Sequence, residues 1–139
     1  MCEELERVIE TELIPERYAL ITPVPLHKVR LRHRGFNQAM LLAEGIVDQF
    51  PNAEVFTGLQ RIRPTKTQSR LNDPNDRKSN VRGAFAVDRN VDLTGRQVLL
   101  IDDVVTSGGT AHECAKALQR AGAEAVDILS FALALPKKD

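Results

Sequence analysis

The run Val98–Thr110 limits the fold of this chain more than any other feature. Four apolar residues lead into two adjacent acids, Asp102 and Asp103, and a turn of small residues follows. A nearly continuous apolar run is typical of a parallel strand that is covered on both faces. The residues after it, 108–121, have the spacing of an amphipathic helix. Strand, turn and helix in this order indicate an open α/β sheet, which binds ligands where its strands end.

The turn after the two acids has the composition of an anion site. Gly108 and Gly109 let the backbone come close to a ligand, and backbone N–H groups at a helix start attract phosphate. Thr106, Ser107 and Thr110 add hydroxyl donors. Carboxylates do not bind phosphate directly, so the two acids must serve neighbouring hydroxyls or a cation. The run therefore predicts a site for a ribose 5-phosphate with bound Mg²⁺.

Other interpretations of this run are weaker. The sequence contains neither the GxGxxG pattern of dinucleotide sites nor the GxxxxGK[ST] pattern of a P-loop. A purely structural interpretation makes Asp102 and Asp103 helix-capping residues and the glycine pair a plain turn. Two adjacent acids at the end of a buried strand are unfavourable unless a ligand uses them, so the ligand site is preferred.

The rest of the chain alternates between helical and strand-like segments. Pro15 ends the first helix and Gly122 ends the last one. The pattern predicts one α/β domain over 1–139, with a mostly parallel, twisted sheet of about five strands and helices on both faces. A small hood is expected from the first helix and the chain's end. The helices are expected at 3–13, 37–50 and 108–121, and the strands at 18–24, 53–57, 84–87, 97–101 and 126–135.

The charge distribution favours a small anionic ligand over a large polyanion. The net charge is zero, yet eleven of the nineteen Lys and Arg residues lie within 28–34 and 61–82. Five Phe and one Tyr do not make a platform for nucleic acid. No apolar run reaches the about 18 residues of a membrane span, and the start of the sequence is acidic, so we expect a cytoplasmic protein without a membrane segment. The sequence does not decide whether the protein forms a homodimer.

The run Val98–Thr110 resembles the motif with which type I phosphoribosyltransferases bind 5-phosphoribosyl-1-pyrophosphate (PRPP). The resemblance implies that Thr106, Ser107, Gly108, Gly109 and Thr110 hold the 5-phosphate. It also implies that the two acids face the ribose hydroxyls and the magnesium shell. Mg²⁺ is thus the expected cofactor, and Asp102 and Asp103 are its expected ligands through PRPP hydroxyls or water.

Two further segments resemble the ComF family, the competence-associated branch of phosphoribosyltransferase-like proteins. They are Pro23–His27, with the sequence PVPLH, and Arg34–Gln38, with the sequence RGFNQ. The resemblance implies that they lie at the pyrophosphate loop, with Pro25, Leu26, Arg34 and Gly35 as binding residues. The alternative for Arg34 and the other basic residues of 28–34 is a solvated basic edge without a ligand. ComF proteins commonly begin with a four-cysteine zinc ribbon, whereas this sequence contains only Cys2 and Cys114, which we interpret as reduced thiols.

Residues 60–82 are expected to be a flexible loop, and in this resemblance the stretch Arg61–Phe85 corresponds to the flexible catalytic loop. The segment is polar and basic, and loops of this length in compact domains are usually functional or disordered. Arg63 and Lys66 are the candidate catalytic residues of a loop that closes over PRPP and shields the reacting ribose from water. The alternative is that these charges only keep the loop solvated.

The expected reaction displaces pyrophosphate from PRPP with a nitrogen nucleophile that the sequence does not identify. In the 6-oxopurine members of the fold, an Asp stands where this chain has Thr106, so hypoxanthine and guanine are expected to be poor acceptors. A second hypothesis makes the protein a non-catalytic PRPP- or nucleotide-binding accessory of DNA uptake, in contact with proteins of that machinery.

Overall fold

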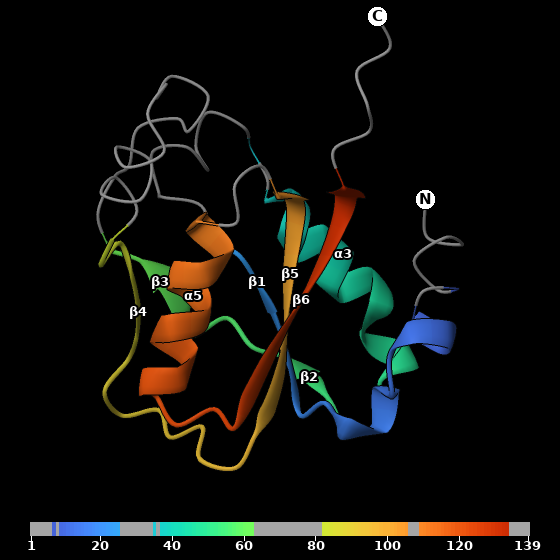
Figure 1. The fold of residues 1–139 in the computed structure, drawn as a ribbon, viewed down its shortest axis with the longest axis horizontal. Coiled ribbons are helices and arrows are strands. Elements are labelled where there is room, and N and C mark those ends of the chain that lie inside the picture. Colours follow the sequence, from blue (N-terminus) through green and yellow to red (C-terminus); the bar gives the residue numbers. More distant parts are fainter. Residues whose placement is uncertain are drawn as a thin grey trace, which may run out of the picture.

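The computed structural model describes residues 7, 9–25, 35, 37–62, 82–105 and 109–133, with the backbone alone at 103–105 and 131–133. These residues form an α/β structure around a parallel sheet with the strand order β2-β1-β5-β6 (Figure 1). The strands are β1 (Leu20–Pro23), β2 (Glu54–Val55), β5 (Gln97–Val105) and β6 (Ala125–Leu133), and the two main helices are α3 (Gln38–Ile46) and α5 (Gly109–Arg120). The parallel α/β architecture is the one that the sequence predicts.

The sheet contains four described strands, where the sequence indicates about five. The segment expected as a strand near 84–87 is strand β4 (Phe85–Val87), but it pairs antiparallel with β3 (Leu59–Arg61) in a separate ribbon. Gln60 and Arg61, which the sequence assigns to a loop, are therefore strand residues. The remainder of that expected loop, 63–81, lies outside the described residues.

The strand order makes the two strand–helix–strand connections run toward opposite edges of the sheet. From β1 the chain passes through α3 to β2 on one side, and from β5 it passes through α5 to β6 on the other. Strands β1 and β5 are neighbours, paired from Leu20 with Val98 to Pro23 with Ile101. In open α/β sheets, ligands bind beyond the carboxyl ends of the strands at such a switch point.

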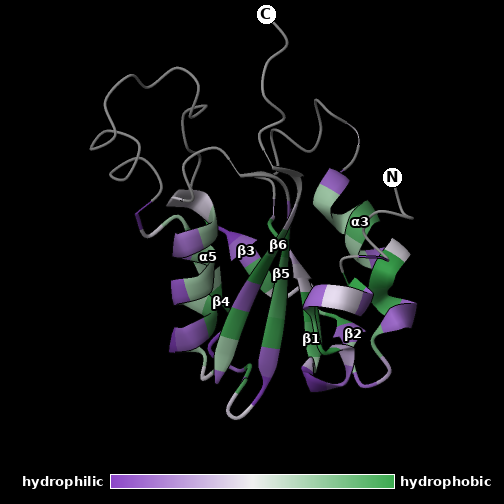
Figure 2. Cartoon of the chain, turned by 45° about the vertical axis from the view of Figure 1, so that its right-hand side comes forward, coloured by the Kyte–Doolittle hydropathy of each residue, from purple (hydrophilic) through white to green (hydrophobic). Residues whose placement is uncertain are grey.

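Each face of the sheet carries its own apolar core, because successive strand residues point to opposite faces. Leu20, Val98 and Leu100 pack with α5 on one face. Ile21 and Leu99 pack with α3 on the other face. Figure 2 shows the apolar strands lying between the two helices, and the polar side of α5 faces outward. The run Val98–Ile101 is fully buried, as expected for a strand covered on both faces.

The first helical segment belongs to the α3 side of the molecule. Residues 7 and 9–12 are helical, and Ile9 is fully buried in the core beside α3. Tyr18 packs there edge-on against Phe50, with ring centroids 5.7 Å apart. The described part of the expected hood thus packs into the core on the α3 side of the sheet. Residues 134–139 lie outside the described residues.

The ends of the helices follow local sequence signals. Asn37 is the N-cap of α3, and its side chain accepts a hydrogen bond from the Ala39 amide. Helix α5 ends before Gly122, whose φ of +109° favours glycine, as the sequence predicts. Helix α3 continues into a 3₁₀ turn, Val47–Gln49. No helix in the described part of the chain is long and apolar enough to cross a membrane.

Candidate functional site

The candidate site lies where β1 ends beside β5, which we call the carboxyl end of the sheet. The Val24 amide donates to the Ile101 carbonyl at 2.9 Å, and β1 stops at Pro23. Strand β5 continues to Val105 because β6 still pairs with it, with Val104 opposite Ala132. The sequence indicates a strand that stops at Ile101, so this expectation is wrong: both acids lie within β5 rather than beyond it.

Asp102 is the acid whose side chain the structure describes. It is 7% exposed and lies two residues beyond Leu100, on the face covered by α5. Ser130 of β6 stands opposite it in the parallel register, and the buried Ser130 Oγ has no hydrogen-bond partner among the described residues. Asp103 is described by its backbone only. A largely buried carboxylate at a strand end must be balanced by hydrogen bonds or by opposite charge.

The expected 5-phosphate residues meet the carboxyl end of the sheet where α5 begins. Gly109 and Thr110 form the first positions of that helix and are half-buried. The start of a helix offers backbone N–H groups and the positive end of the helix dipole to an anion. Thr106, Ser107 and Gly108 lie outside the described residues, so their role stays a prediction.

The expected pyrophosphate residues lie between β1 and α3, on the other side of the switch point. Pro25 follows directly after Val24, and Gly35 is exposed with a φ of +75°. This backbone conformation explains the glycine, because side chains make it strained. Leu26 and Arg34 lie outside the described residues.

Asn37 holds the two ends of this connection together, and the sequence interpretation missed it. Its Nδ2 atom donates to the Val24 carbonyl oxygen at 3.1 Å, while its Oδ1 atom accepts from the Ala39 amide at 3.0 Å. One side chain therefore caps α3 and fixes the exit of β1. Its position just before a helical run was the available signal for the cap.

The two expected catalytic residues of the basic loop, Arg63 and Lys66, lie outside the described residues. The structure instead describes a nearby cation that sequence reasoning did not single out. Arg61 ends β3, and its guanidinium carbon lies 4.8 Å from the centroid of the Phe85 ring. Such cation–π contacts are favourable and hold a guanidinium in a defined orientation.

The thiol of Cys114 lies inside the α5-side core, close to this charged group. Burial raises its pKa above the usual range, the charge of Arg61 opposes the increase, and the charges of Asp102 and Glu113 add to it. Cys114 is fully buried and is not part of a disulfide among the described residues. It is therefore a neutral packing residue, as expected for a reduced thiol, rather than a nucleophile.

The donor groups fit a magnesium ion that arrives with a ligand better than a metal site built by protein alone. Among the described residues, no three His, Cys, Asp or Glu side chains gather as a metal-binding cluster. Protein-bound Mg²⁺ is commonly held by one or two carboxylates together with substrate phosphates and water. The Asp102 carboxylate at the carboxyl end of the sheet matches that smaller requirement, and Asp103 follows it in β5 with only its backbone described.

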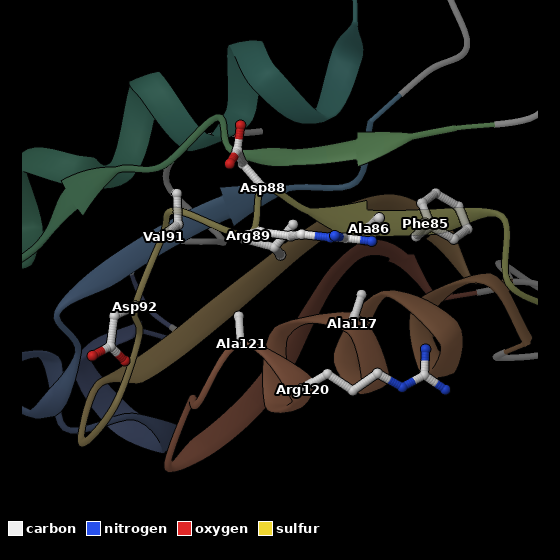
Figure 3. Close-up of a pocket in the computed structure, with 10 residues that line it drawn as sticks. Phe85, Ala86, Asp88, Arg89, Val91, Asp92, Ala117, Arg120 and Ala121 are labelled. Carbon is white, nitrogen blue, oxygen red and sulfur yellow. The ribbon is translucent and has the colours of Figure 1, made fainter.

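A pocket of about 420 Å³ lies elsewhere, between the 85–92 segment and the C-terminal half of α5 (Figure 3). Its acids are already engaged: Asp88 accepts from the Asn90 amide at 2.8 Å, and Asp92 accepts from the Thr94 amide at 2.9 Å. These bonds stabilise turns, and the bonds to Thr94 hold the pKa of Asp92 below its usual range. The pocket contains none of the expected site residues.

Comparison with protein families and curated proteins gives consistent matches. The phosphoribosyl transferase domain family matches residues 37–138. Competence protein F of Haemophilus influenzae is 36% identical over 116 residues, which cover 82% of this chain and 50% of that protein. DNA utilization protein YhgH of Escherichia coli K12 is 37% identical over 115 residues, covering 83% and 48%. The chain spans about half the length of the curated relatives it matches.

Solved structures support the fold. A structure described as the allosteric regulatory enzyme of purine biosynthesis superposes with a TM-score of 0.54 and 19% identity, covering 89% of this chain and 23% of that chain. Glutamine PRPP amidotransferase from Bacillus subtilis, complexed with ADP and GMP, superposes with a TM-score of 0.53 and 16% identity. The match covers 89% of this chain and 24% of that chain. At this level of identity, the likeness concerns the arrangement of helices and strands alone.

Proposed function

Because this chain belongs to the phosphoribosyl transferase domain family, we propose that it binds PRPP with Mg²⁺ where β1 and β5 end side by side. The resemblance to ComF proteins and to the type I phosphoribosyltransferase fold is confirmed. The observation that carries the proposal is the switch point between β1 and β5. The PRPP-like motif runs along β5 into α5 at that point, where α/β sheets bind their ligands.

In this proposal, the two sides of the switch point divide the ligand between them. Thr106–Thr110, the sequence that leads into α5, bind the 5-phosphate through backbone N–H groups and hydroxyls. Pro25, Leu26, Arg34 and Gly35, between β1 and α3, bind the pyrophosphate, and Arg34 supplies the charge for it. The distance between the sites is then set by the paired strands, so the rigid sheet orients the ribose.

Asp102 and Asp103 would hold the magnesium ion, through ribose hydroxyls or water. When bound, the ion neutralises charge on the departing pyrophosphate. The acids themselves orient the ribose and favour the positive charge that develops on it as the bond to pyrophosphate breaks. Arg63 and Lys66 are proposed to contact the pyrophosphate and to exclude water, with Lys66 available for proton transfer from the acceptor.

The proposed reaction transfers the phosphoribosyl group to a nitrogen acceptor in the cytoplasm. A second candidate function is non-catalytic binding of PRPP or a nucleotide in DNA uptake. The observation that favours it is the naming of the relatives as a competence protein and as a DNA utilization protein. Since the chain spans about half of those proteins, their whole-protein roles do not transfer directly to it.

Calorimetric titration with PRPP, in the presence and absence of Mg²⁺, tests the binding proposal. We expect saturable, magnesium-dependent binding, and ribose 5-phosphate should compete for the site. An absence of PRPP binding by the folded chain would overturn the proposal. Pyrophosphate release with a panel of nucleobases and amines then separates the two functions, because binding without turnover with any acceptor favours the accessory role.

A further inference from the structure

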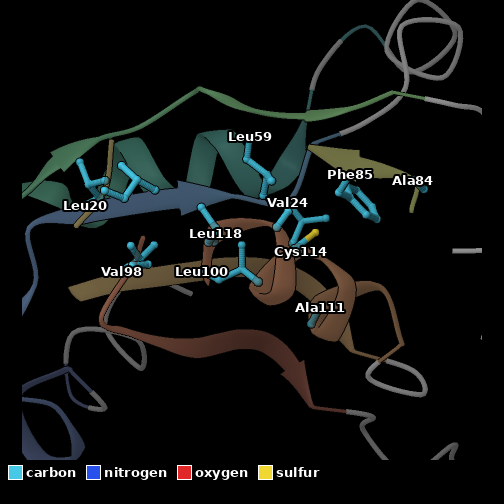
Figure 4. Packing of buried hydrophobic residues seen from close by; sticks show 13 residues of the cluster. Leu20, Val24, Leu59, Ala84, Phe85, Val98, Leu100, Ala111, Cys114 and Leu118 are labelled. Carbon is cyan, nitrogen blue, oxygen red and sulfur yellow. The ribbon is translucent and has the colours of Figure 1, made fainter. Parts of the chain in front are cut away.

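Two charged residues lie next to the apolar core on the α5 side of the sheet, toward the carboxyl end of the sheet. On ribbon β3–β4, Arg61 lies two residues beyond Leu59, which is 3% exposed within this core. On β5, Asp102 lies two residues beyond the fully buried Leu100. Because strand residues alternate with a period of two, each charged side chain shares the face of its apolar neighbour. Figure 4 shows Leu59, Leu100 and Cys114 within this core.

Arg61 is held from the ribbon side. Its guanidinium stacks over Phe85, its Nε atom is buried, and Phe85 itself is 3% exposed. In the antiparallel ribbon, Arg61 pairs with Phe85 directly. A planar guanidinium stacked on a ring keeps the donors along its edge available for a carboxylate. Arg61 is therefore a half-buried cation whose guanidinium is oriented by the Phe85 ring.

Asp102 needs such a cation. Its side chain is 7% exposed, and a buried carboxylate without compensating charge or hydrogen bonds is strongly unfavourable. The charge of Arg61 lowers the pKa of the fully buried Cys114 thiol and the charge of Asp102 raises it, so both charged groups lie near this thiol. The other acid that acts on this thiol, Glu113, has its own cation, because Lys116 Nζ lies 3.7 Å from Glu113 Oε1.

We propose that Arg61 is a positioning residue of the phosphoribosyl site: it balances the charge of Asp102 across the core and so fixes the end of β5 against ribbon β3–β4. The part that concerns ligand binding rests on the proposed function. Arg61 does not contact the ligand in this proposal. It holds the Asp102 carboxylate in one orientation, so that the carboxyl end of β5 has one arrangement when PRPP arrives.

A double-mutant cycle tests the pairing without any ligand. Arg61→Gln, Asp102→Asn and the combined variant are unfolded by heat, with Arg120→Ala as the control because Arg120 is exposed at the far end of α5. Each single variant should lower Tm by about 10 °C, because it leaves one charge buried and unbalanced. The combined variant should lose no more than either single one. Additive losses would overturn the proposal.

Magnesium-dependent PRPP titration then tests the positioning role. Arg61→Gln, which keeps much of the packing over Phe85, should weaken binding about tenfold or more, because small displacements at a site have large effects. Arg61→Lys, which keeps the charge, should restore most of the affinity, and Arg120→Ala should match the wild type. Equal affinities for Arg61→Gln and wild type would overturn the role.

The two proposals fail in different ways. If wild-type protein does not bind PRPP while the cycle shows coupling, the proposed function fails and the charge pairing stands. If wild type binds PRPP while Arg61 and Asp102 show no coupling, the pairing fails and the proposed function stands. Should Arg61→Gln not fold, Arg61→Met, which also removes the charge, completes the cycle with Asp102→Asn, and independence of these two changes would contradict the pairing.

Discussion

The side-chain amide of Asn37 donates a hydrogen bond to the carbonyl oxygen of Val24 at 3.1 Å, which joins the start of α3 to the end of β1. The same side chain caps α3 through the Ala39 amide. The connection between these two points contains the proposed pyrophosphate residues. Asn37 thus fixes both ends of the proposed pyrophosphate segment relative to the sheet.

Replacing Asn37 separates these two roles. Asn37→Ser keeps a good helix cap but loses the amide that reaches Val24, whereas Asn37→Ala loses both. We expect Asn37→Ala to lower the free energy of unfolding by about 2 kcal/mol and Asn37→Ser by about 1 kcal/mol. Both should weaken PRPP binding more than ribose 5-phosphate binding, because only PRPP carries pyrophosphate. Urea unfolding and calorimetry measure the two effects, and equal weakening of both ligands would argue against the role in the pyrophosphate segment.

The two acids of β5 should respond differently to neutralisation. Asp102→Asn should destabilise the fold, because Asp102 is buried in the α5-side core. Asp103→Asn should leave Tm nearly unchanged and weaken magnesium-dependent PRPP binding about 10- to 100-fold, the effect of a charge-assisted hydrogen bond. The double variant should lose magnesium-dependent binding. Unchanged PRPP affinity in folded Asp103→Asn would refute the assignment of that acid.

Local signals in the sequence predict much of this fold. The buried run Val98–Ile101 and the helix stop at Gly122 depend on residues close together in the chain, and the structure has both. Strand β3 was missed because only Leu59 of its three residues is buried. That strand exists because Phe85–Val87 lies antiparallel to it, and no local pattern contains such a pairing.

The candidate site could be located from the sequence, but its internal organisation could not. The apolar run stops at Ile101, yet β6 supplies partners for β5 as far as Leu133 and so draws the acids into the strand. The burial of Asp102 and the stacking of Arg61 on Phe85 are features of the folded chain. They bring together segments that are distant in the sequence, so no local pattern contains them.

Tyr18 makes stability depend on alkaline pH. Burial, and then its 2.6 Å hydrogen bond to Asp127 Oδ2, raise the pKa of Tyr18 above its ordinary value. A pKa raised in the folded state gives stability that is present below the unfolded value of about 10 and is lost as pH rises beyond it. We expect Tyr18→Phe to lose about 1 to 2 kcal/mol at pH 7 and to show a shallower decline between pH 9 and 11. Urea unfolding of wild type and Tyr18→Phe at several pH values in this range measures the effect. If the free energy of unfolding falls equally with pH in both proteins, Tyr18 is not responsible.

Replacement by alanine should change the stability of the protein in opposite directions at two glycines. Gly122 has a φ of +109°, and an added Cβ would lie 2.8 Å from Thr94 Oγ1 and 2.9 Å from the Thr94 amide nitrogen. Gly122→Ala should therefore destabilise the protein by about 1 to 3 kcal/mol. Gly45 lies within α3 with open space around it, so Gly45→Ala should stabilise by about 0.5 to 1 kcal/mol. Thermal unfolding of both variants compares them directly, and a stabilised Gly122→Ala would contradict the conformation of this turn.

The identity of Thr106 predicts which acceptors the protein does not use. In the 6-oxopurine members of this fold, an Asp at this position exchanges a proton with the purine ring, and a threonine hydroxyl is far too weak a base for that role near pH 7. In the proposed site the Thr106 hydroxyl would donate to phosphate, so PRPP binding should be normal while hypoxanthine and guanine react poorly. Incubation with PRPP, Mg²⁺ and either base, followed by chromatography of the nucleotides, measures this. Thr106→Asp serves as the matched variant, and efficient formation of either monophosphate by the wild type would require a different general base.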